Sequence, residues 1–197
     1  MDCPDGTWRK TTMPSVHIAI LRGSYEGATV NDAFELAIGS SLALDRRAAG
    51  PWCCLPYPGH PRGCPNYGQR DTCPPKAPLL TTFFDITQPM WLIVQPFDMA
   101  GHMRHMAQSH RGWSQAQLRC CLYWQGGVRV QLADAVRLAQ WRHPGTVATM
   151  SPEAMGLNVF ATMRKLGVRL SLHPEQIVYK VALLGQKQEF PLAKVQP

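Results

Sequence analysis

Proline and cysteine are concentrated in one short segment of this chain, PWCCLPYPGHPRGCPNYGQRDTCPPKAP, residues 51–78. The segment holds eight of the seventeen prolines and four of the seven cysteines. Proline has no backbone N–H group and fixes φ, while glycine and proline together favour tight turns. The segment therefore cannot continue a helix or a central strand. We expect a series of turns held by contacts other than ladder hydrogen bonds, and thiolates bound to a metal would supply such contacts.

The remaining composition is that of an ordinary globular chain. It has 197 residues, of which 45% are hydrophobic and 17% charged. We therefore expect a single domain over residues 1–197 whose core is large enough to be stable without covalent cross-links. There is no run of eighteen apolar residues, and the first residues carry acids without the apolar stretch of a secretory signal. These features predict a cytoplasmic protein with no membrane span.

The expected cytoplasmic location affects how the cysteines are interpreted, and the net charge indicates which partners are favoured. In a reducing cytosol, clustered cysteines are more often metal ligands or catalytic thiols than disulfides. The formal net charge of +7 favours anionic partners, but it is spread along the chain and supports nucleic-acid binding only weakly.

Hydrophobic patterns predict alternating strands and helices around the cysteine loop. Strands are expected over 15–21, 79–84, 90–94 and 177–184, because each is a short apolar run. Helices are expected over 32–48, 114–142 and 151–167, with Gly126-Gly127 as a point where the second could break. The fold class is accordingly α/β or α+β, a single compact domain with a mixed sheet, flanking helices and an irregular metal-binding loop over 51–78.

Helical spacing assigns the residues of the 114–142 segment to two faces. Six of them fall on the face expected to point inward: Leu118, Cys121, Val128, Leu132, Val136 and Ala139. A basic and aromatic set falls opposite, of the kind that contacts phosphates and stacks on bases: Arg119, Tyr123, Arg137 and Trp141. A solvated amphipathic face is the more ordinary interpretation of that set.

The loop cysteines are widely spaced. Cys53, Cys64 and Cys73 are separated by ten and eight residues, and Cys54 follows Cys53 directly. Zinc fingers and ribbons use paired Cys-x-x-Cys spacing instead. Single, proline-backed cysteines on separate turns suit an iron–sulfur cluster, most naturally 4Fe–4S, because a cluster is larger than one ion. Zinc is the alternative cofactor.

A cluster with four irons has a fourth ligand position, for which several groups compete. The candidates are Cys54, Cys120, Cys121 and His60. Alternatively no side chain fills it, and the open iron binds and polarises a substrate.

Two motifs resemble an uncharacterised family of predicted cysteine-rich metal-binding proteins, seen mostly in anaerobic bacteria and archaea. One is the loop pattern of Cys, then Cys-Pro-x-Tyr-Gly, then Cys-Pro-Pro; the other is Arg-His-Pro followed by Ser-x-Glu-Ala-x-Gly and a helix. The likeness covers roughly Trp52 to Leu184. It implies that Cys53, Cys64 and Cys73 are the shared ligands. Family members often carry further ferredoxin-like cysteines before Arg-His-Pro, where this chain has LAQW, so a second cluster is not expected.

Other polar residues are candidates for catalysis. His60 and Tyr67 lie within the loop and would surround an open iron, and His143, in Arg-His-Pro, would donate a proton near it. His102, His105 and His110 form a histidine group that we interpret as surface residues in preference to metal ligands.

We therefore expect an iron–sulfur protein whose cluster acts as a redox centre or as a Lewis acid at an open iron. Its partner would be a small or nucleotide-like substrate or a redox protein, and an enzyme of this kind would be an oxidoreductase or a lyase. The alternative is a non-enzymatic binding module, stabilised by zinc, that contacts nucleic acid or an acidic protein.

Overall fold

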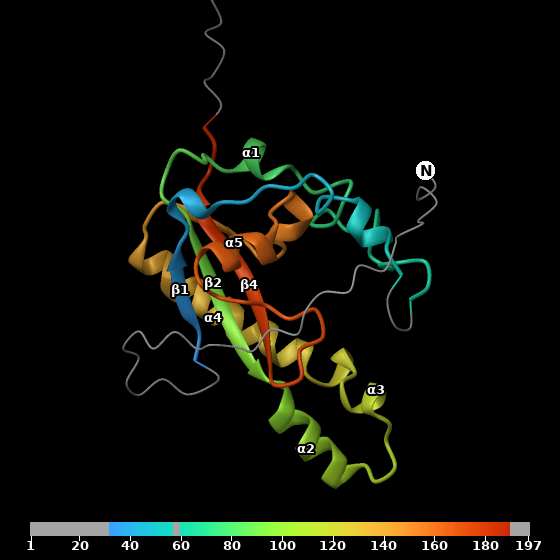
Figure 1. Ribbon diagram of the computed structural model, residues 1–197. Coiled ribbons are helices and arrows are strands. Elements are labelled where there is room, and N and C mark those ends of the chain that lie inside the picture. Colours follow the sequence, from blue (N-terminus) through green and yellow to red (C-terminus); the bar gives the residue numbers. More distant parts are fainter. Residues whose placement is uncertain (1–31, 57–59, 190–197) are drawn as a thin grey trace, which may run out of the picture.

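An antiparallel sheet forms the centre of the molecule in a computed structural model that describes residues 32–56 and 60–189. Its strands run in the order β1-β2-β4-β3 (Figure 1). Their bounds are Phe34–Ala37 for β1, Trp91–Asp98 for β2, Thr146–Thr149 for β3 and Ile177–Gln186 for β4. Every pairing among these strands is antiparallel. The expected fold class is confirmed in its α+β form, and the sheet is antiparallel where a mixed one was expected.

Helices cover both faces of this sheet (Figure 1). On one face, α4 (Gln125–Arg142) buries Leu132, Val136 and Ala139 against Ile93, Ala182 and Leu184 of β2 and β4. The other face is covered by α1 (Leu80–Phe83), the 3-10 helix η4 (Pro152–Met155) and α5 (Val159–Lys165). The core there includes Leu80, Phe84, Leu92, Val94, Leu157, Met163 and Leu183. The two central strands are thus buried on both sides.

Strand β2 continues through Pro96, although the sequence predicted that Gln95-Pro96 would end it. The reason is the short length of β1, which pairs only with Trp91–Val94. Beyond Val94, β4 is the one neighbour of β2 among the residues that the structure describes, and Pro96 lies opposite Tyr179. A proline whose nitrogen faces an open edge removes no ladder hydrogen bond.

Two of the predicted strands are confirmed, since β2 contains 90–94 almost entirely and β4 contains 177–184. The strand expected over 15–21 lies outside the described residues. The one expected over 79–84 is wrong, because α1 forms there. Leu80 and Phe84 are both fully buried and lie four residues apart, a spacing that matches one helical turn.

The helix predicted over 32–48 is also wrong. Residues Phe34–Ala37 form β1, whose register places Phe34 opposite Val94. A 3-10 helix, η1 (Gly39–Ser41), follows, and Gly39 has a positive φ of 50°. Pairing with β2 and the left-handed glycine therefore outweigh the helical spacing of the apolar residues.

The predicted helix over 114–142 is divided into three elements. Ser114 and Gln117 form the expected capping box at the start of α3 (Gln115–Leu118), and the 3-10 helix η3 (Cys121–Tyr123) precedes α4. The break falls before Gly126-Gly127, which lie in the first turn of α4. Because the break shifts the register, Cys121 is exposed, against the prediction, while Leu118 and the four predicted α4 residues are buried.

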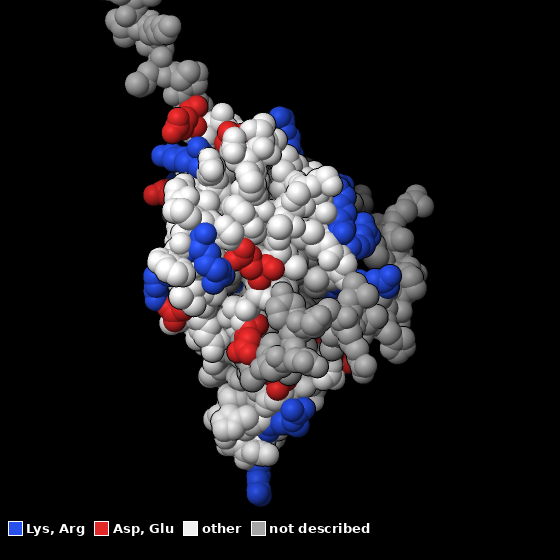
Figure 2. Space-filling view, turned by 90° about the vertical axis from the view of Figure 1, so that its left-hand side faces the viewer, with Lys and Arg blue, Asp and Glu red and all other residues white. Residues whose placement is uncertain are grey.

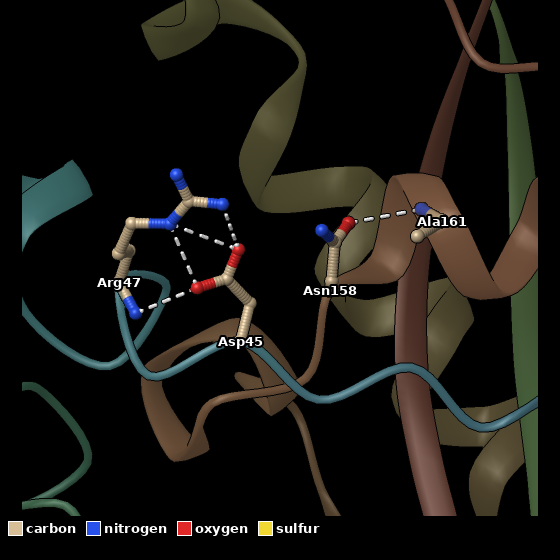
Figure 3. Close-up of polar contacts among 4 residues, drawn as sticks. All are labelled: Asp45, Arg47, Asn158 and Ala161. Carbon is tan, nitrogen blue, oxygen red and sulfur yellow. Dashed lines mark hydrogen bonds and ion pairs between the residues drawn. The ribbon is translucent and has the colours of Figure 1, made fainter.

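The predicted helix over 151–167 is divided as well. Gly156, with φ of 93°, separates η4 from α5. Asn158 begins α5, its side chain accepting a hydrogen bond from the Ala161 N–H (Figure 3). The remaining helices are η2 (Pro51–Cys54), within the cysteine loop, and α2 (Met99–Ser109), which directly follows β2. Across the described ranges, none of the helices has the length and apolar character needed to cross a membrane.

Candidate metal site in the cysteine loop

The cysteine loop is a chain of turns, as its composition predicts. After η2, backbone hydrogen bonds close successive short turns, from Gly63 to His60, from Tyr67 to Cys64 and from Cys73 to Arg70. One longer contact joins two of the cysteines, since the Cys64 N–H donates to the Cys53 carbonyl over 2.7 Å. This bond holds the second cysteine turn against the first.

Gly63 makes that close approach possible. Its φ is +81°, and a Cβ at this position would lie 2.4 Å from the Cys53 carbonyl oxygen. A clash with main chain is not relieved by side-chain rotation. Only glycine therefore fits between the turns that carry Cys53 and Cys64.

Three of the predicted ligands are free thiols of the cysteine loop. Cys53, Cys64 and Cys73 are all partly buried and carry no disulfide. Burial raises the pKa of the Cys53 thiol, and the negative charges of Cys64, Cys73 and Glu153 raise it further. Cys64 and Cys73 are therefore close enough to act on Cys53 electrostatically. Within residues 32–56 and 60–189, however, no group of three or more His, Cys, Asp or Glu side chains is arranged to hold a metal ion.

The groups considered for a fourth ligand lie in different places. Cys54 is disulfide-bonded, whereas the sequence favoured thiols throughout the loop. Cys120 and Cys121 are free thiols at η3, beside α4. The charge of Cys121 acts on Lys180 of β4 and is not among the charges that act on Cys53.

The second motif of the resemblance packs against the segment that leads into the loop. Ala43 and Asp45 are joined to it by backbone hydrogen bonds, from Asn158 N–H to Ala43 O and from Asp45 N–H to Gly156 O. Gly156 also lies against Asp45 and Ala49. The Asp45 carboxylate binds the Arg47 guanidinium and backbone N–H, which turns the chain toward η2 (Figure 3). The second motif therefore packs against the segment that directly precedes the first motif in the chain.

Glu153 joins the thiol site through this packing, and the sequence interpretation missed it. The residue lies on η4, and its charge acts on Cys53. It keeps an exposed surface, but the protein around it raises the pKa of Glu153 by burial, against the attraction of Lys180. The sequence signal for this acid is its place in the Ser-x-Glu-Ala-x-Gly motif.

A small cavity lies between the second motif and the segments that precede and follow the cysteine loop. Its volume is about 210 Å³, and its lining includes Leu44, Arg46, Leu79, Met155 and Gly156. Pockets for drug-sized ligands usually measure about 300–1,000 Å³. This cavity suits at most a small group.

The three candidate catalytic residues are separated. His60 and Tyr67 lie in the loop, and their backbones take part in its turns. His143 instead follows α4, where its ring stacks on Trp91 at 3.9 Å and its Nε2 lies 2.6 Å from Oε1 of Glu35. Its contacts are thus with β1 and β2, and a role as proton donor beside the thiols gains no support from them.

The predicted basic and aromatic face is also divided. Arg119 donates to the Pro174 carbonyl, and Arg137 binds Asp134. Tyr123 is exposed before α4 and Trp141 near its end, eighteen residues later, which is roughly 27 Å along a helix. These four residues do not form one continuous surface.

The histidine group lies on and after α2. His102 packs against Phe97, and His110 stacks on Trp113. His105 and His110 are exposed, as expected, whereas Nε2 of His102 is buried and has no hydrogen-bond partner within residues 32–56 and 60–189.

Comparisons of this chain with protein-family models, with curated proteins and with solved structures found no match. The resemblance to a cysteine-rich metal-binding family rests on the residues of the two motifs, and it stays a prediction.

Proposed function

We propose that this chain binds one iron–sulfur cluster, of the 4Fe–4S type, through Cys53, Cys64 and Cys73. The observation that carries the proposal is that three free, partly buried thiols lie on separate turns of one loop, two of which are joined by the hydrogen bond from the Cys64 N–H to the Cys53 carbonyl. Soft sulfur donors of this kind favour iron–sulfur clusters and zinc over harder ions.

The arrangement of the thiols favours a cluster over a single ion. Zinc draws its thiolates to about 2.3 Å from one point. The three cysteines are separated by ten and eight residues and lie on separate turns, unlike the paired Cys-x-x-Cys ligands of zinc fingers. A cluster is larger and takes its cysteines from more widely spaced positions.

The surroundings favour a cluster that has an open iron. Cys54 is engaged in a disulfide, and Cys121 lies at η3, so the loop offers three cysteines as thiols. A bound cluster would supply electron transfer or Lewis-acid polarisation of a small substrate. Glu153, whose charge acts on Cys53, would donate a proton or orient such a substrate. The enzyme would then be an oxidoreductase or a lyase.

Anaerobic reconstitution with iron and sulfide tests this proposal. We expect a brown protein with broad visible absorbance and several irons per chain. Cys64→Ser should abolish the chromophore, while Cys120→Ser, which removes a free thiol outside the loop, should retain it. Retention in Cys121→Ser as well would support the open iron.

Two outcomes would contradict the assignment. A colourless protein that binds one zinc ion would favour the alternative, a zinc-stabilised binding module. A full cluster in the Cys64→Ser variant would show that the ligands lie elsewhere.

A further inference from the structure

The segment from α2 to η3 forms an arm, residues 99–124, that the proposed cluster site does not use. It begins where β2 ends and includes α2, α3 and η3. In Figure 1 the arm projects from the lower end of the sheet, whereas the cysteine loop lies at the upper right. A function of the arm is therefore spatially separate from the thiols of the cysteine loop, Cys53, Cys64 and Cys73.

Positive charge without acidic residues distinguishes this part of the chain. Asp98 and Asp134 enclose 35 residues that contain no Asp or Glu, but four arginines and three histidines. Figure 2 shows blue side chains at the lower tip of the molecule, the end at which Figure 1 places α2. Such a balance attracts a polyanion.

A groove of about 450 Å³ runs between α2 and α3. Arg104 and Arg119 line it together with apolar residues that include Met103 and Leu118, and Glu175, from the segment before β4, adds one acid to its wall. Two guanidinium groups against one carboxylate leave the groove positive. An extended anionic chain matches this charge better than a neutral one.

Aromatic rings stack in the connection between α2 and α3, the two helices that line the groove. His110 lies on Trp113 with centroids 3.9 Å apart and planes 8° apart, and Trp113 contacts Tyr123 at 5.2 Å. Tyr123 is 56% exposed, and Arg111, next to His110 in the chain, is exposed as well. The stack thus presents aromatic surface to solvent beside a cation.

We propose that the arm binds single-stranded nucleic acid. An exposed ring stacks on any base, and arginines contact the phosphates, which is the combination that single-strand binders use without reading sequence. Tyr123 would extend its stack with a base, while Arg104 and Arg111 contact the backbone. A duplex offers no free base faces inside its stack, and an acidic peptide has no planar ring to match Tyr123, so the aromatic surface favours a single strand.

Fluorescence anisotropy of the full chain with a labelled oligothymidine of about 15 nucleotides tests the proposal. We expect binding that weakens as salt rises from about 50 to 200 mM. Tyr123→Ala should weaken it about fivefold or more, and Arg111→Ala should lower the salt slope by about one. Trp141→Ala and Arg164→Ala remove an exposed aromatic residue and an exposed cation outside the arm, and they should leave the affinity within about twofold.

Absence of binding at about 50 mM salt would overturn the proposal. Equal affinity for a duplex or for polyglutamate, with no loss in Tyr123→Ala, would also overturn it and indicate a general acidic partner. If Tyr123→Ala alters the far-UV circular dichroism, Tyr123→Leu repeats the test, since leucine keeps an apolar contact with Trp113 but has no aromatic face. None of these readouts depends on the cluster, so the two proposals fail separately.

Discussion

The sheet and the cysteine loop are stabilised in different ways. In the sheet, β2 and β4 pair over eight residues, and both of their faces are buried by helices. In the loop, short backbone turns and one close glycine contact fix the chain, and most of its residues keep exposed surface. Apolar burial thus determines one region, and local backbone geometry determines the other.

This difference predicts how each region responds to substitution. The sheet should lose global stability when a buried side chain is shortened, because the lost contacts belong to the shared core. The loop should lose its local geometry, and with it the arrangement of the thiols, at a lower cost to global stability.

The largest effect is expected for Leu183→Ala in the centre of β4. Leu183 is fully buried, at 0% exposure, in the core beneath α5. Removing most of a buried leucine side chain leaves a cavity and costs about 2–5 kcal/mol. Urea unfolding followed by circular dichroism should show a lower midpoint with little change in slope.

Leu172→Ala is the matched control, since the same atoms are removed from a side chain that is 71% exposed. It should change the free energy of unfolding by less than about 0.5 kcal/mol. Equal losses in the two variants would mean that apolar burial does not distinguish the sheet from the rest of the chain.

The sequence predicted the parts of the fold in which the local pattern and the tertiary environment agree. The apolar run IVYKVALL became β4, and Val128, Leu132, Val136 and Ala139 became the buried stripe of α4. The prediction failed for Phe34–Ala37 and for Leu80–Phe83. Each has an apolar pattern compatible with helix or strand, and pairing or burial by distant residues decided between them.

The candidate site likewise has parts that follow from the local sequence and parts that depend on distant residues. The grouping of Cys53, Cys64 and Cys73 in one loop could be predicted, because all three lie within 21 consecutive residues. Glu153 acts on Cys53 from η4, which Gly156 and Asn158 join to the segment before the loop. His143 faces Glu35, 108 residues away in the chain. No spacing rule in a single sequence predicts contacts over such separations.

An intermediate effect is expected for Gly63→Ala in the loop. The substitution adds the strain of a left-handed alanine, about 1–2 kcal/mol, and places a methyl group against the Cys53 carbonyl oxygen. The turns that carry Cys53 and Cys64 must then separate. We expect faster reaction of these thiols with a thiol reagent, while the circular dichroism of the sheet persists.

Gly68→Ala separates the two causes. Gly68 also has a positive φ, of 71°, but its added methyl group would meet no atom within 4 Å. In the Gly68→Ala variant, the loop thiols should react with the thiol reagent at nearly the wild-type rate. If both variants expose the thiols equally, then backbone strain alone, without the contact at Cys53, controls the geometry of the loop.

The smallest effect is expected at the edge of the sheet, where β1 is held by backbone pairing with β2 and by side-chain contacts of Glu35. The Glu35 carboxylate accepts a hydrogen bond from Arg142 over 2.8 Å and lies 2.6 Å from His143 Nε2. Burial favours its neutral form, but the hydrogen bonds and charges of Arg142 and His143 outweigh burial and hold the pKa of Glu35 below its usual 4.5. The charged carboxylate therefore stabilises the folded state.

Glu35→Gln should lower the free energy of unfolding by about 1 kcal/mol at neutral pH. Because the folded-state pKa is the lower one, this contribution is complete above about pH 4.5 and is lost as the pH falls through the folded value. The difference between variant and wild type in urea midpoint should accordingly shrink toward about pH 3. Glu175→Gln, at an exposed position, is the control and should change the midpoint little. If the difference in urea midpoint between Glu35→Gln and wild type does not vary with pH, then backbone pairing and packing, and not the Glu35 charge, attach β1 to the sheet. The edge of the sheet would then be stabilised in the same way as its centre.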